Sequence, residues 1–116
     1  MSFKFEQLKV WQRAMDLGEE VNSMALTFPE RERFNLSSQM LRAVDSVALN
    51  ISEGSIGQSN PEFRKFIGYS IRSLAEVITC LYKARRRDYI KQEQFDAVYD
   101  ASFNLMNMMA AFKNSI

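Results

Sequence analysis

The sequence of 116 residues contains no histidine, one cysteine, two prolines and four glycines. Without histidine it lacks the commonest acid–base and metal-binding side chain. The single cysteine, Cys80, excludes an intrachain disulfide and argues against a cysteine-based metal site. The four glycines form neither a phosphate-binding loop nor a dinucleotide fingerprint. We therefore expect no metal, no cofactor and no enzymatic activity.

Long apolar segments are also missing. No run of about 18 apolar residues could cross a membrane. The first ten residues, MSFKFEQLKV, lack the basic and then apolar layout of a signal peptide. The sequence therefore predicts a cytoplasmic protein with no membrane partner.

The residues that are present are typical of a globular protein. Apolar residues make up 47% of the chain and charged residues 25%, which is not the composition of a disordered tail. A chain of this length forms one core. We expect a single domain over residues 1–116.

Charge is unevenly distributed along the chain. Residues 61–91 carry eight Lys/Arg against three Asp/Glu, a net charge of +5, whereas the segments on either side carry −2 each. An anionic partner would meet the middle segment first.

Apolar residues at steps of three and four predict four amphipathic helices, at about residues 6–27, 36–53, 61–87 and 92–113. Burial in the first is expected to be dominated by Trp11. Its predicted apolar face is Leu8, Trp11, Met15, Gly18, Val21, Ala25 and Phe28. The second has Leu36, Met40, Ala43, Val44, Val47 and Ile51. The third has Phe63, Phe66, Ile67, Ser70, Leu74, Val77, Ile78 and Leu81, and the fourth Phe95, Val98, Ser102, Leu105, Met109 and Phe112.

Breaks between these patterns predict the connections. Pro29 ends the first helix, and residues 30–35 form a short exposed link. Gly54 suits a left-handed C-cap of the second helix. Asn60 is the expected N-cap of the third, with Pro61 at its first position.

Four such helices with short links predict an all-α, antiparallel, up-down-up-down four-helix bundle. The third helix is longer than the second, so its basic C-terminal end should project beyond the bundle.

The basic residues of the middle segment have two interpretations. Cations in the last turn of a helix stabilise it against the dipole and keep the surface solvated. Alternatively, the group forms a phosphate-contact patch for RNA or DNA. The candidate nucleic-acid-binding residues are Arg64, Lys65, Arg72, Lys83, Arg85, Arg86, Arg87 and Lys91.

A polar stripe on the flank of the second helix also has two interpretations. It is either a solvated face or a polar ladder that is buried or lies between subunits. Glu53 favours the ladder, because a carboxylate in the last turn of a helix faces the negative end of the dipole and needs a partner. The ladder candidates are Gln39, Arg42, Ser46, Asn50 and Glu53, facing Tyr69, Ser73, Glu76 and Cys80.

Several segments resemble a known family. FEQLKVWQRA, FPERERFNLSSQMLRA, SVALNISEG and EFRKFIGYSIRSLAE are similar to the bacterial four helix bundle proteins first noticed as the 23S rRNA-intervening sequence protein family. The resemblance covers about residues 3–90. The chain departs from the pattern at Arg72, where the family usually has a small residue, and at residues 56–58, where a basic residue often occurs.

The resemblance implies a homo-oligomer, commonly a pentamer, with no established enzymatic activity. It also implies kinship with the accessory variability determinant of diversity-generating retroelements, whose basic barrel is associated with nucleic acid and a reverse transcriptase. We therefore expect an accessory that binds itself and RNA, DNA or a nucleic-acid-processing protein. The alternative is a structural or protein-interaction module that binds no nucleic acid.

Overall fold

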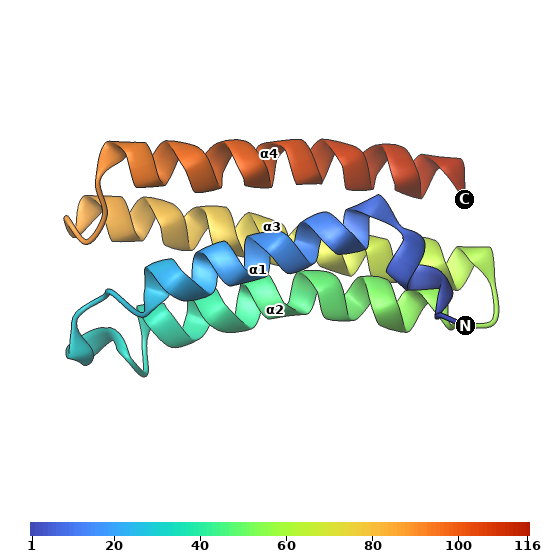
Figure 1. Ribbon diagram of the computed structural model, residues 1–116, viewed down its shortest axis with the longest axis horizontal. Coiled ribbons are helices and arrows are strands. Elements are labelled where there is room, and N and C mark those ends of the chain that lie inside the picture. Colours follow the sequence, from blue (N-terminus) through green and yellow to red (C-terminus); the bar gives the residue numbers. More distant parts are fainter.

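The computed structural model describes residues 1–116 and contains four long helices joined by short connections. They are α1 (Lys9–Ala25), α2 (Leu36–Ser55), α3 (Asn60–Arg86) and α4 (Gln92–Ser115), with short 3₁₀ helices η1 (Lys4–Gln7) and η2 (Glu30–Glu32). Successive helices run in opposite directions (Figure 1). α1 and α3 each pack against α2 and α4, whereas the diagonal pairs make no close contact. The expected all-α, up-down-up-down bundle is confirmed.

The apolar stripes predicted for α2 and α4 lie in the core. All six apolar positions of α2 are buried, and in α4 only Phe112 of the predicted seam is partly exposed. One continuous cluster of 26 buried residues draws on all four helices. These two helices therefore define the bundle interior as their spacing predicts.

The buried face of α1 differs from the predicted one. Val10, Ala14 and Leu17 are buried, while Met15 is 44% exposed and Trp11 lies half-buried at the edge. The Trp11 indole N–H donates to Ser52 Oγ at 2.9 Å. The ring therefore lies beside α2, where its polar atom is satisfied. The prediction that Trp11 dominates burial on this helix is wrong.

Gly54 permits close packing and does not cap α2. The helix continues through Ser55, and no glycine has a positive φ. A Cβ atom on Gly54 would lie 2.6 Å from the Cβ of Phe66 and 2.9 Å from a ring carbon of Phe63. The left-handed conformation instead occurs after α3, at Asp88 with φ 61°.

The start of α3 also differs by one residue from the prediction. Ser59 is the N-cap, and its Oγ accepts the Glu62 backbone N–H at 3.2 Å. Asn60 and Pro61 therefore lie within the first turn. A serine N-cap satisfies a backbone donor as well as asparagine does, so the sequence alone did not separate the two.

None of the four helices combines the length and the apolarity that a membrane-crossing helix requires.

Candidate nucleic-acid interface

The outward face of α3 carries a row of cations. Lys65, Arg72, Lys83 and Arg86 are all exposed and spaced so that they share one side of the helix. The row is about 31 Å long at 1.5 Å per residue. None of the four has an ion-pair partner, since the two ion pairs of the protein use Arg33 and Arg87. Between Lys65 and Arg86, Glu76 is the one carboxylate on this side of the helix.

One end of this row opens into a hollow between α3 and α4. The hollow has a volume of about 540 Å³ and its charged lining residues are Lys65, Arg72 and Lys113. Gly68 also lines this hollow, and a Cβ atom there would make an ordinary contact with Lys113 Nζ at 3.5 Å. The sequence reasoning missed Lys113, which is the single cation of an otherwise acidic segment. Its proximity to Arg72 depends on how α3 and α4 align.

The other predicted cations have different surroundings. The Arg85 guanidinium lies 3.9 Å from the centre of the Phe95 ring. Arg87 Nη1 lies 3.0 Å from Glu32 Oε2. Arg64 donates to the backbone oxygen of Ile116. Lys91 is exposed just before α4. The basic residues therefore do not form one cluster.

The end of α3 is covered and does not project. Ala84 and Ile90 are buried, and the α1–α2 connection lies at the same end of the bundle as the α3–α4 turn (Figure 1). The expectation of a protruding basic end is wrong, because Glu32 of η2 binds Arg87 and Tyr89 just beyond the last residue of α3.

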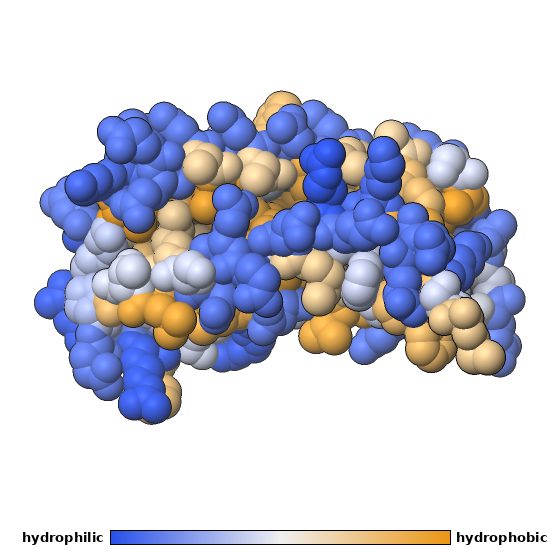
Figure 2. All heavy atoms as spheres, viewed as in Figure 1, coloured by the Kyte–Doolittle hydropathy of each residue, from blue (hydrophilic) through white to orange (hydrophobic).

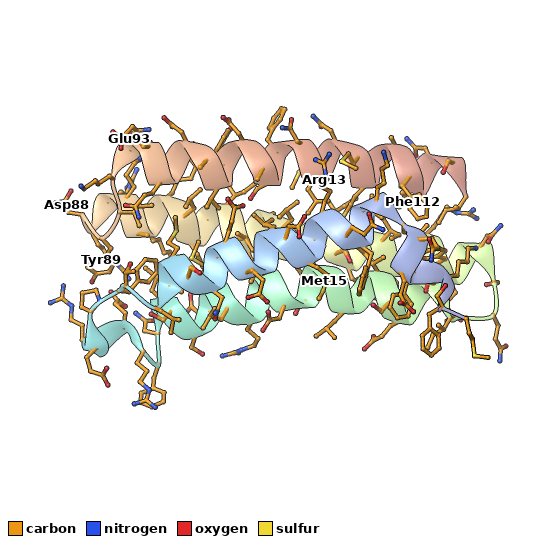
Figure 3. All side chains as sticks on the ribbon, viewed as in Figure 1. Arg13, Met15, Asp88, Tyr89, Glu93 and Phe112 are labelled. Atoms are coloured by element: carbon orange, nitrogen blue, oxygen red, sulfur yellow. The ribbon has the colours of Figure 1, made fainter.

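Glu32 is the residue that holds this end together. It is only 5% exposed, whereas the other residues of the link over residues 30–35 are exposed as predicted. The Tyr89 hydroxyl donates to the Glu32 carboxylate at 2.6 Å, and Arg87 donates at 3.0 Å. Figure 3 shows Tyr89 at this end, beside the α1–α2 connection. The Tyr89 hydrogen bond lowers the pKa of Glu32 below its ordinary value, burial opposes this, and the Leu36 amide and Arg87 add to the lowering.

The sequence did contain a signal for part of this cluster, because Glu32 lies four residues before Leu36, the first residue of α2. Asn35 and the Leu36 backbone N–H also donate to Glu32 Oε1, at 3.1 and 3.4 Å. The positive end of the α2 dipole favours such a charge. The partners on the α3–α4 turn were not predictable, because they are more than 50 residues away in the chain.

Comparison with models of known protein families identifies the family of this chain. A model of the 23S rRNA-intervening sequence protein family matches residues 6–111. The chain belongs to this family. The resemblance inferred for about residues 3–90 is thereby confirmed, and the match extends beyond it into α4.

A solved structure of similar fold comes from the S23 ribosomal protein family of Bacteroides thetaiotaomicron VPI-5482, a protein of unknown function. It superposes with a TM-score of 0.81 at 23% identity, over 90% of this chain and 97% of that one. At this identity the likeness concerns the fold alone. No protein of curated function matches the sequence.

In this member of the 23S rRNA-intervening sequence protein family, much of the polar ladder lines a groove between α2 and α3. The groove has a volume of about 500 Å³, and its polar lining includes Gln39, Arg42, Ser46, Ser73, Glu76 and Lys83. Cys80 also borders it, and burial raises the pKa of this thiol. The predicted facing of the two helices is confirmed for these residues, whereas Tyr69, Asn50 and Glu53 lie outside the groove.

The ladder makes no bond across the groove. Arg42 donates to Ser38 Oγ at 3.0 Å, and Ser46 and Asn50 each donate to the backbone carbonyl four residues earlier in α2. Glu53 is exposed and forms no ion pair. A buried ladder within one chain is therefore wrong, because the groove is open to solvent. A ladder between subunits stays a prediction.

The neighbouring face of this family member, formed by α1 and α2, is more apolar. A hollow of about 320 Å³ between the two helices is lined in part by Trp11, Met15, Gly18 and Leu49. Leu49 is 58% exposed, and Leu26 and Ile56 are exposed as well. Figure 2 shows apolar side chains on this side as separate orange patches among hydrophilic ones, and Figure 3 labels Met15 between α1 and α2.

Proposed function

We propose that the protein is a non-enzymatic, homo-oligomeric accessory that binds nucleic acid through the outward face of α3. The observation that supports this most directly is the row of Lys65, Arg72, Lys83 and Arg86, none of which is neutralised by a carboxylate of the chain. Lys113 adds a fifth cation at one end.

A linear row of unpaired cations suits a phosphate backbone. Each phosphate that such a cation neutralises releases a condensed counterion, which gives affinity that falls steeply with salt. Contacts of this kind position a nucleic acid without reading its sequence. The proposed binding is therefore weakly sequence-specific.

Self-association is proposed to use the α1/α2 face. Met15, Leu26, Leu49 and Ile56 are exposed aliphatic or thioether side chains on this half of the bundle, and apolar patches on a surface are typical of protein–protein contacts. A ring of five copies, which the family resemblance implies, would repeat the cationic face around its axis. We place this assembly in the cytoplasm.

The test is a titration of labelled RNA at about 50 and about 200 mM salt. Double substitution of Arg72 and Lys83 by alanine should weaken binding and reduce the slope of log K against log salt. The reduction should be about 0.7–0.9 for each phosphate contact that is lost. The matched control is Lys9→Ala with Arg13→Ala, which removes two exposed cations from α1 and should leave the slope unchanged.

A second candidate function is a protein-interaction module without nucleic acid. It is favoured by the contacts of Arg85 with Phe95 and of Arg87 with Glu32, because these two cations already bind groups of the same chain. No binding of RNA or DNA by the wild-type protein at low salt would leave this candidate and reject the first.

A further inference from the structure

A row of aromatic rings follows α4 beside α3. Phe95 and Tyr99 are stacked with ring centres 5.6 Å apart and planes inclined by 20°, and Tyr99 and Phe103 are stacked at 6.3 Å and 17°. Tyr82 of α3 packs against Phe95 in a T-shaped arrangement, with ring centres 5.0 Å apart. The Arg85 guanidinium lies over both Phe95 and Tyr82, so a cation covers the first ring of the row.

The far end of this row is open to solvent, because Phe103 is 52% exposed. At the other end, beside Phe95, Tyr82 is 39% exposed. Phe103 has Tyr99 as its one ring partner. A half-exposed ring contributes little to the core, so burial does not account for an aromatic residue at this position.

Within the helices, exposed large apolar side chains differ in kind between the two halves of the bundle. On α1 and α2 they are Met15 and Leu49, whereas on α3 and α4 they are Tyr69, Tyr82 and Phe103. The segments outside the helices expose both kinds, among them Phe3, Leu26, Phe34 and Ile56. Aliphatic surface suits a protein partner. Aromatic surface beside cations suits nucleobases, because every base has a π-face that can stack on a ring.

The open rings lie close to the cationic row. Tyr82 packs against Phe95 and Tyr99, while Gly68 lies beside Lys113. This antiparallel register places Phe103 level with the part of α3 between Arg72 and Lys83. Bases on the rings would therefore have cations on both sides for their phosphates.

We propose that the α3/α4 face binds single-stranded nucleic acid, with a base stacked on Phe103 and phosphates held by Arg72, Lys83 and the hollow that contains Lys113. This inference rests on the proposed function and adds a preference for unpaired bases, since a duplex keeps its base faces covered. Asp96 and Asp100 are exposed on α4, and their charge keeps the phosphates on the α3 side.

The experiment compares one short RNA, its duplex and the single-stranded DNA of the same sequence. The wild-type protein should bind both single strands more tightly than the duplex. Phe103→Leu, which keeps an apolar side chain but removes the ring, should raise the Kd for single strands by roughly 5- to 150-fold, the range expected for one stacked base. The Kd for the duplex should not change. A 2-aminopurine base in the single strand should be quenched by wild type and less by the variant.

The matched control is Phe34→Leu, which removes an 88% exposed ring from the α1–α2 side and should leave every Kd as in wild type. Equal affinity of wild type for single strands and duplex, or an unchanged single-strand Kd for Phe103→Leu, would overturn the stacking proposal while the cationic face still stands. Absence of binding to all three probes would overturn the proposed function as well. An effect on RNA but not on DNA would support stacking and assign the ligand to RNA.

Discussion

Gly54 of α2 and Phe66 of α3 approach so closely that a Cβ atom on the glycine would lie 2.6 Å from the Cβ of the phenylalanine. This distance is shorter than the non-bonded contacts that real Cβ atoms make. The clash involves the first side-chain atom of Phe66, which cannot rotate away without moving the backbone of α3. α3 is therefore packed against a position of α2 that must have no side chain.

The first prediction concerns this contact. Gly54→Ala should lower the free energy of unfolding by about 1–3 kcal/mol through overpacking. Gly18→Ala is the control, because a Cβ atom on Gly18 of α1 meets nothing within 4 Å. Removing a glycine from a helix interior should raise stability by up to about 1 kcal/mol. Urea denaturation measures both, and equal effects of the two substitutions would contradict the packing argument.

Two fully buried serines should respond oppositely to substitution. Ser70 Oγ donates to the Val47 backbone carbonyl across the α2/α3 interface at 2.8 Å, whereas Ser102 Oγ has no hydrogen-bond partner. Ser70→Ala should lower stability by about 1 kcal/mol. Ser102→Ala should raise it by about 1 kcal/mol, because it removes an unsatisfied hydroxyl. Thermal unfolding at constant protein concentration measures both signs, and destabilisation by Ser102→Ala would show that its hydroxyl is satisfied.

The Glu32 cluster predicts a dependence of stability on pH. The pKa of Glu32 is lower in the folded chain than in the unfolded one, chiefly through the Tyr89 hydrogen bond. The unfolded state then binds the proton more readily, so this carboxylate stabilises the fold above the ordinary Glu pKa of about 4.3, and the contribution is lost as pH falls below it.

Glu32→Gln should therefore be less stable than wild type at neutral pH, with the difference shrinking toward acid. Denaturation curves collected between neutral and acidic pH measure this. Glu30→Gln removes one negative charge from the same segment at an exposed position and serves as the control. A constant difference between Glu32→Gln and wild type at every pH would exclude the linkage.

Arg42 and Glu53 provide the test of assembly. Neither forms an ion pair within the chain, so Arg42→Ala and Glu53→Ala should each change the stability of the isolated subunit by no more than about 0.5 kcal/mol. If they pair between subunits, each should reduce the native mass measured by light scattering. Arg13→Ala and Glu20→Ala, exposed on α1, should not. If both ladder variants have the native mass of the wild type, Arg42 and Glu53 do not pair at the subunit interface.

The helices were predictable where one apolar stripe dominates. α2 and α4 each carry a single run at three-four spacing, and their buried faces agree with it. α1 carries two adjacent stripes, one containing Trp11 and Met15 and the other Ala14 and Leu17. Periodicity cannot choose between them, because the choice depends on the hydrogen bond from Trp11 to Ser52 of another helix.

The candidate site was predictable only in part, for a related reason. Lys65, Arg72, Lys83 and Arg86 share a face because they share one helix. Phe95, Tyr99 and Phe103 also share one helix, at steps of four residues. The position of Lys113 near Arg72 and the partners of Glu32 depend on the alignment of one helix with another, which no single segment encodes. Gly54 was misread because a glycine that caps a helix and a glycine that admits a neighbouring helix look the same in a sequence.

The partners of Glu32 have a consequence for how the chain folds. The carboxylate belongs to the hairpin of α1 and α2, whereas Tyr89 and Arg87 belong to that of α3 and α4. Either hairpin alone would lack the hydrogen bonds of Glu32 to Arg87 and Tyr89. The contact therefore stabilises the complete bundle and neither half of it, which adds to the cooperativity of unfolding.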